Sequence, residues 1–118
     1  MDTKEIVKKI VEYINAGKNV EAEEELYADD VLSVEQNGYS AQGKDMIIEK
    51  TKAAGANFEE FYGAKVTKAF AGKDNFLLEI TIDAKPKGAE RMTMSEYGFY
   101  KIKDGKISEE YFFMEPLS

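Results

Sequence analysis

The sequence contains neither cysteine nor histidine. Without cysteine, disulfide bonds and thiolate metal sites are excluded. Without histidine, the chain lacks the commonest general base and the commonest metal ligand. Any catalysis would therefore rest on carboxylates, tyrosines, lysines or backbone groups. The acidic residues also lack the regular spacing of a calcium loop, so we expect neither a metal nor a cofactor.

The chain also lacks an excess of positive charge, with 16 basic against 23 acidic residues, and it has no long apolar run. Its formal net charge is −7, with scattered basic residues, which argues against nucleic acid and anionic membranes as partners. No segment reaches the length needed to cross a membrane, and the start "MDTKEIVKKI" lacks the apolar core of a signal peptide. We therefore expect a cytoplasmic protein.

A chain of 118 residues with 43% hydrophobic content suits one domain spanning residues 1–118. Three helices are predicted in its first half. Asp2 and Glu5 have the spacing of a capping box, and isoleucines recur every fourth residue until Gly17 ends the first helix. A second, short helix is expected from Asn19 through "VEAEEELYADD", and a third over residues 44–54, ending at Gly55.

The second half reads as strands separated by turns. After a short strand "VLSVEQ" at residues 31–36, extended segments are predicted at 57–70, 76–85, 91–102 and 106–115. Helices followed by an antiparallel meander indicate an α+β fold, with three N-terminal helices packed on one face of a curved, mainly antiparallel sheet.

The turn "KDG" fixes the expected register of the last hairpin. A three-residue loop pairs Ile102 with Lys106, which makes Glu96 and Glu110 diagonal neighbours on the even-numbered face. The same parity predicts an apolar face toward the helices, made of Phe76, Leu78, Ile80, Ile82, Met92, Met94, Phe112 and Met114. Apolar surroundings and a neighbouring carboxyl should both raise the pKa of Glu110.

The odd-numbered face carries a cluster of four aromatic residues. An aromatic patch with a polar rim on the outer face of a sheet predicts a homodimer interface, formed by Tyr97, Phe99, Tyr111 and Phe113. Cover by the chain's own loops is the alternative.

Four short motifs together carry a resemblance to a known family. They are "NAGK" at 15–18, "LYADDV" at 26–31, "GKD" at 43–45 and "KDGKI" at 103–107. In this order and spacing, the chain resembles the SnoaL-like branch of the nuclear-transport-factor-2-like superfamily over nearly its whole length. The resemblance implies a cone with an internal pocket and dimers formed through the outer sheet face. The family hosts isomerases, cyclases, dehydratases and binding modules, so it implies no single activity.

The resemblance also points to individual positions. Where ketosteroid isomerases carry a general base, this chain has Glu35, but the two oxyanion-donor positions hold Ile10 and Gly98. The last hairpin is closer to the polyketide-cyclase branch, and there Glu110 stands where a histidine or aspartate is usual.

Two function classes remain open from the sequence. One is a domain that binds a small apolar organic molecule, and the other is an enzyme using carboxylate acid–base chemistry. The catalytic candidates are Glu35 as a base, and Glu96 with Glu110 as a proton-sharing pair; each could instead be a solvated or structural carboxylate. The expected pocket residues are Ile10, Ile14, Tyr27, Phe76, Tyr100, Phe112 and Met114.

Overall fold

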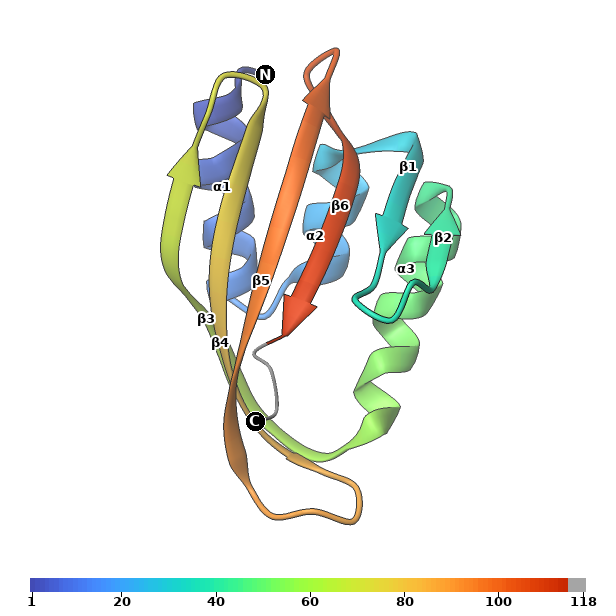
Figure 1. Ribbon diagram of the computed structural model, residues 1–118, viewed down its shortest axis with the longest axis vertical. Coiled ribbons are helices and arrows are strands. Elements are labelled where there is room, and N and C mark those ends of the chain that lie inside the picture. The colour runs from blue at the N-terminus through green and yellow to red at the C-terminus, as the bar shows by residue number, and fades with distance from the viewer. Residues whose placement is uncertain (115–118) are drawn as a thin grey trace.

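The computed structural model describes residues 1–114 and has three α-helices on one side of a six-stranded sheet (Figure 1). The helices are α1 (Thr3–Asn15), α2 (Asn19–Leu26) and α3 (Lys44–Ala54), which is followed by the 3₁₀ turn η1 (Gly55–Asn57). The strands are β1 (Tyr27–Val34), β2 (Ser40–Gln42), β3 (Phe58–Ala71), β4 (Asn75–Pro86), β5 (Met92–Lys103) and β6 (Lys106–Met114). The expected α+β class is confirmed.

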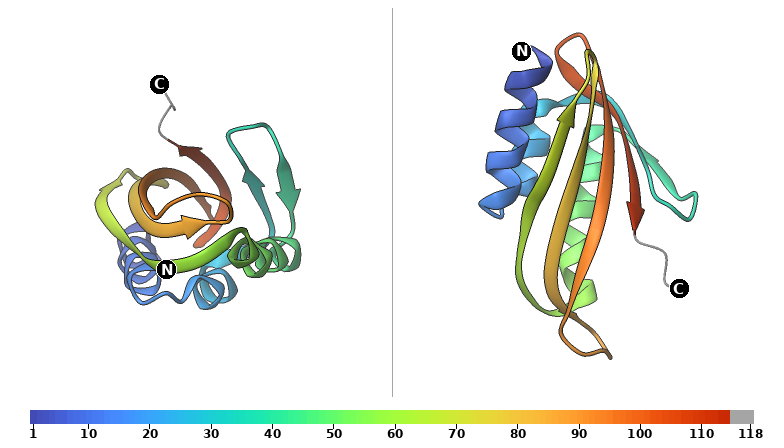
Figure 2. Two further views of the ribbon diagram at one scale, coloured as in Figure 1. Left: turned by 90° about the horizontal axis from the view of Figure 1, so that it is seen from below. Right: turned by 60° about the vertical axis from the view of Figure 1, so that its left-hand side comes forward.

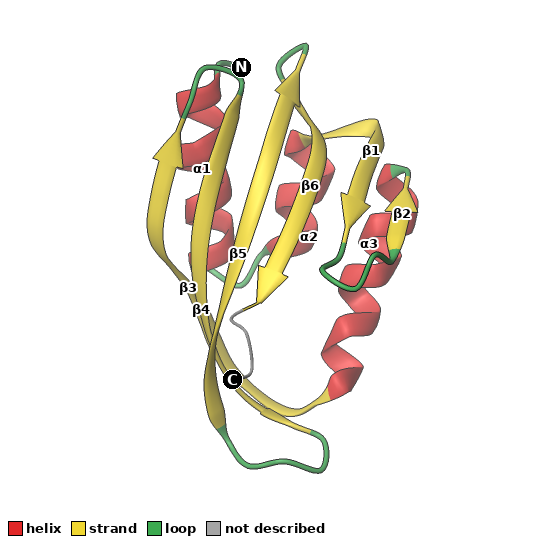
Figure 3. Ribbon diagram, in the orientation of Figure 1, coloured by secondary structure: helices red, strands yellow, loops and turns green. Residues whose placement is uncertain are grey.

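The sheet has the strand order β2-β1-β6-β5-β4-β3. The pair β1–β6 is parallel and all other pairs are antiparallel, so the sheet is mixed but mainly antiparallel. Seen end-on, the long strands curve around a space that the helices cover from one side (Figure 2). Figure 3 shows how little of the described chain lies outside helices and strands.

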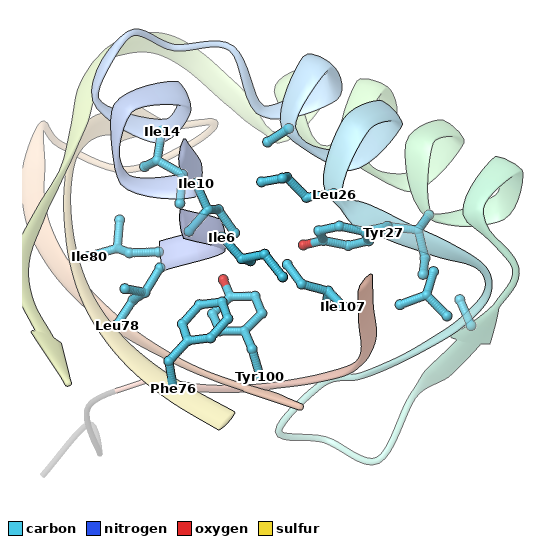
Figure 4. Packing of buried hydrophobic residues seen from close by; sticks show 14 residues of the cluster. Ile6, Ile10, Ile14, Leu26, Tyr27, Phe76, Leu78, Ile80, Tyr100 and Ile107 are labelled. Carbon is cyan, nitrogen blue, oxygen red and sulfur yellow. The ribbon is translucent and has the colours of Figure 1, made fainter. Parts of the chain in front are cut away.

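The first helix begins and ends where the sequence predicts. The Asp2 side chain accepts a hydrogen bond from the Glu5 backbone N–H at 2.9 Å, which satisfies a free donor of the first turn. After the last turn, Gly17 adopts a left-handed φ of 73°. Between these ends, Ile6, Ile10 and Ile14 are buried against the sheet (Figure 4).

Two predicted elements need correction around β1. The second helix ends at Leu26, and Tyr27–Asp30, expected to be helical, begin β1 instead. Part of "QNGYSAQGKD" (residues 36–45), expected to be a loop, is the short edge strand β2, paired with β1. Pairing of β1 with the distant strand β6 decides this conformation, and that long-range contact leaves no local signal. The predicted last strand reached Glu115, which lies outside the described residues.

The last hairpin turns over two residues, not three. Asp104 and Gly105 have φ values of 54° and 74°, as a two-residue turn with both central residues left-handed requires. Lys103 pairs with Lys106 and Ile102 with Ile107. Beyond them, Lys101 pairs with Glu109, which leaves Ser108 as a bulge.

The bulge restores the expected parity but shifts the partners. Even-numbered residues of β5 still face even-numbered residues of β6, so Tyr100 lies opposite Glu110 and Glu96 opposite Met114. Glu96 and Glu110 are therefore two same-face steps apart, and their prediction as diagonal neighbours is wrong. The inward face is otherwise as expected for Phe76, Leu78 and Ile80, which are all buried.

The two methionines at the ends of this face do not pack beneath the helices. Met92 and Met114 are 40% and 36% exposed. The β4–β5 hairpin extends beyond the helical layer (Figure 1), and Met92 pairs with Ala84 toward that end. Met114 is the last residue of β6. Residues at these places lie outside the region that the helices cover.

Candidate functional site

A cavity of about 800 Å³ lies between the helices and the inward face of the sheet. Its deepest residues are buried and largely apolar: Ile10, Ile14, Ala22, Tyr27, Ile80 and Tyr100. Its mouth is formed by exposed residues at the α1–α2 connection and at the end of α3 with η1, together with Phe61. An apolar cleft with a few polar groups is the usual form of a small-molecule site.

Five of the seven expected pocket residues line this cavity. They are Ile10, Ile14, Tyr27, Tyr100 and Phe112. Phe76 and Met114 do not line it. Phe76 stacks against Tyr100 with ring centroids 4.6 Å apart and is 1% exposed, within the core behind the tyrosine (Figure 4).

The three catalytic candidates all line the cavity, and Glu110 is the most deeply buried of them, at 2% exposed. Its carboxylate accepts a hydrogen bond from the Tyr27 hydroxyl. Burial raises the pKa of Glu110 above its ordinary value, against hydrogen bonds from Tyr27 and Ser33 and the charge of Lys50, while the charge of Glu35 adds to the rise.

Glu96 lies on β5 and lines the cavity. Burial raises its pKa to about 7, with further contributions from the negative charges of Glu35 and, less strongly, Glu110, and with Lys50 opposing. Glu35, just beyond β1, is thus the carboxyl that acts most on Glu96. The register of β5 and β6 does not bring Glu96 and Glu110 together as a proton-sharing pair.

A lysine from α3 connects the helix to the acidic wall. Lys50 Nζ lies 2.7 Å from Glu35 Oε1 and donates to Ser33 Oγ at 2.9 Å. The same Nζ lies 5.8 Å from the centre of the Phe112 ring. Sequence reasoning did not place this residue, because helix packing on the sheet decides which lysine reaches the cavity.

A further cavity carboxylate, Glu23 on α2, was also missed; Glu23 and Glu110 are the two buried acidic residues of the described chain. It lines the cavity, is 7% exposed, and accepts a hydrogen bond at 2.5 Å from Thr51 on α3. Burial raises the pKa of Glu23 to about 7; the charge of Glu110 raises it further, and Thr51 and Lys50 lower it. The stretch "EAEEEL" suggests a solvated helix face, yet Glu23 lies beside the inward residues Ala22 and Leu26. The position of Glu23, three residues before the inward Leu26, was the signal in the sequence that its side chain faces inward.

Two buried tyrosines supply hydroxyl groups to the interior (Figure 4). Burial raises the pKa of Tyr27 and of Tyr100 well above the ordinary value, so both stay protonated donors. The Tyr100 ring folds over Gly98, where an added Cβ would lie 2.8 Å from the Tyr100 hydroxyl oxygen. Position 98 is one of the two places where ketosteroid isomerases carry an oxyanion donor, and here the Tyr100 hydroxyl occupies the space of its side chain.

Within residues 1–114, no group of three or more acidic side chains is arranged to hold a metal ion. The helices of this part of the chain are also too short or too polar to cross a membrane.

A helical layer over a curved sheet, with a cavity between them, defines an α+β fold of the nuclear-transport-factor-2-like class. A family model for the SnoaL-like domain matches residues 1–114, and the chain belongs to this family. No protein with a curated functional description matches the chain.

Solved structures support the same assignment. A SnoaL-like protein from Mesorhizobium loti, whose description proposes polyketide cyclase and carbohydrate phosphatase assignments, is 35% identical, with 96% of this chain and 99% of that chain covered and a TM-score of 0.87. A SnoaL-like protein from Jannaschia is 12% identical over 96% of this chain and 87% of that one, with a TM-score of 0.81. A protein with a cystatin-like fold from Xanthomonas campestris is 18% identical over 98% of this chain and 92% of that one, with a TM-score of 0.78. The last two likenesses concern the fold alone.

Proposed function

We propose that this SnoaL-like chain binds a small, largely apolar organic molecule in the cavity between its helices and its sheet. The observation that carries the proposal is the cavity itself: about 800 Å³, with isoleucine and aromatic walls and a few carboxylates directed inward. A space of this size accepts a ligand of two or three fused rings by the usual dimensions of small-molecule sites.

A neutral aromatic dye, N-phenylnaphthylamine, tests this proposal because its fluorescence rises in an apolar site. We expect saturable binding to the native chain and at least tenfold weaker binding to Ala64→Phe, which fills part of the cavity from β3. Ala71→Phe is the matched control, since Ala71 is exposed at the other end of β3. Equal dye binding by both variants would place the dye elsewhere and contradict the proposal.

A second candidate function is acid–base catalysis on the same ligand class. Glu96 favours it, because a cavity carboxyl with a pKa of about 7 is suited to gain and lose protons at neutral pH. In this proposal Glu96 acts as the general base, and the charge of Glu35 raises its pKa. Glu110 is held in place by its hydrogen bond from Tyr27. Tyr100 is the candidate donor to a substrate oxygen.

Exchange of the α-protons of tetralone in D₂O, followed by NMR, separates the two functions. An enzyme accelerates the exchange, and Glu96→Gln abolishes the acceleration while dye binding persists. A domain that only binds the ligand leaves the exchange at its uncatalysed rate, both in the native chain and in Glu96→Gln.

We further propose that two copies associate through the outer sheet face. Tyr97, Phe99, Tyr111 and Phe113 lie on adjacent strands there, with the Phe99 and Tyr111 rings 6.5 Å apart and Phe113 48% exposed. A second copy of the same face offers aromatic surface to cover this patch, which is large for a free monomer.

A further inference from the structure

The cavity wall is strongly acidic among the described residues. It carries five glutamates and a single lysine. Glu21 is exposed at the mouth, while Glu23, Glu35, Glu96 and Glu110 lie further in. A cavity built only to hold an apolar body would not need this excess of carboxyl groups, since each loses hydration on burial.

The single lysine does not balance the acidic groups. Lys50 Nζ is bound to Glu35 and Ser33. None of the ion pairs within residues 1–114 includes Glu23, Glu96 or Glu110. Of these three, Glu110 has a hydrogen-bonding partner in Tyr27, and Glu23 has one in Thr51.

Glu23 is the group whose bonding is incomplete. Its Oε2 accepts from Thr51, but its Oε1 is buried without any hydrogen-bond partner, which no other buried side-chain oxygen or nitrogen in the described part of the chain shows. The residue is more than nine-tenths buried and lines the cavity. The terminal torsion of glutamate is broad, so a rotation of the carboxylate can turn Oε1 toward the cavity. When the carboxyl is ionised, a buried acceptor without a partner is costly, and a donor arriving with a ligand would remove that cost.

The remaining walls suit a cation as well as an apolar body. Aromatic rings from four elements line the cavity: Tyr27, Phe58, Phe61, Tyr100 and Phe112. The faces of such rings attract a positive charge. A neutral hydroxyl could donate to one acceptor, but only a cation is also attracted by the negative charge that Glu23 carries when it is ionised.

We propose that the cavity takes a small organic cation, a protonated amine on an apolar aromatic body, and that the carboxylate of Glu23 receives its N–H group. The inference rests on the proposed function, ligand binding in this cavity, and adds the chemical class of the ligand. Thr51 keeps one Glu23 oxygen in place, and the ammonium group takes the other.

Binding of such a cation is coupled to proton release. Glu23 faces Thr51 and Lys50 from α3 and Glu110 from β6, and burial keeps a proton on its carboxyl near neutral pH. Glu96 is protonated for the same reason. An ammonium ion favours the charged carboxylate, so binding expels a proton and becomes tighter as pH rises from about 6 to about 8.

Three ligands with one naphthyl body test the inference by competition with N-phenylnaphthylamine. They are naphthylethylamine, naphthylethanol and naphthylacetate. We expect the amine to bind about tenfold more tightly than the alcohol at pH 8, and the anion to bind most weakly. Calorimetry at about pH 6.5, in two buffers of different ionisation enthalpy, should detect the released proton with the amine only.

Two glutamine variants of α2 form the matched pair. Glu23→Gln should weaken the amine about tenfold and leave the alcohol unchanged, and Glu24→Gln, at an exposed neighbour, should change neither. Dye binding and thermal unfolding of each variant show that it is folded. If the dye binds but the amine is no better than the alcohol, or if Glu23→Gln leaves the amine unaffected, the inference is overturned and the proposed function stands. If neither the dye nor any of the three ligands binds, both are overturned.

Discussion

Among single residues, the distinctive ones are the few carboxyl groups that the apolar cavity holds away from water. Glu23 and Glu96 each have a pKa raised to about 7, and burial is the largest cause for both. Burial raises the pKa of Glu110 as well. A folded protein that keeps such groups protonated loses stability as they are forced to ionise.

The pH dependence of stability follows from Glu23. Its pKa is higher in the folded than in the unfolded chain, so its contribution is complete below about pH 4.5 and is lost as pH rises to about 7. Glu23→Gln removes this loss. The variant should match the native chain at pH 4.5 and unfold with a free energy about 2–3 kcal/mol higher at pH 8.

Urea unfolding at the two pH values measures this difference. Glu24→Gln carries the same change of charge at an exposed position of α2 and should show no such pH-dependent gain. A Glu23→Gln advantage that is equal at both pH values would mean that the carboxyl does not change its proton between them.

At the scale of elements, α3 supplies the positive charge that tempers the acidic wall. Lys50 lowers the pKa of Glu23, Glu96 and Glu110, although it bonds directly only to Glu35 and Ser33. The position of α3 against β1 therefore moderates the pKa of groups on α2, β5 and β6, which burial raises.

Lys50→Gln should raise the pKa of Glu23 and Glu96 further above 7, because it removes a positive charge that favours both carboxylates. Carboxyl NMR titration measures the change. Lys52→Gln, exposed on the same helix, is the control and should leave both values where they are. Unchanged values in Lys50→Gln would show that solvent screens the cavity.

At the scale of the whole molecule, the two faces of the sheet have separate tasks. The inward face builds the cavity with the helices, while the outward face carries the aromatic patch of Tyr97, Phe99, Tyr111 and Phe113. We expect a dimer through that patch, because an exposed ring clustered with three half-buried ones leaves apolar surface in water.

Sedimentation at micromolar concentration should give about twice the 13.3 kDa chain mass. Phe113→Glu should yield monomers, since it places two charges against each other or against aromatic rings at a symmetric interface. Met46→Glu is the control, because Met46 is 57% exposed on α3, which packs on the opposite face of the sheet from the patch. A native monomer would contradict the interface.

Which side chains share a face of a strand follows from the amino-acid order alone. Alternation along each strand is a local property, so the inward positions of Phe76, Leu78 and Ile80 could be predicted without knowing any neighbouring strand. The cap at Asp2 and the glycine end of α1 are equally local.

Which groups meet in the cavity depends instead on how the strands and helices are assembled. The two-residue turn and the bulge at Ser108 separate Glu96 from Glu110, because the offset between strands depends on backbone angles at one turn. The packing of α2 and α3 on the sheet brings Glu23, Thr51 and Lys50 to the cavity. These contacts join residues far apart in the chain, and burial, which sets the pKa of each carboxyl, is a property of the assembled layers and not of the local sequence.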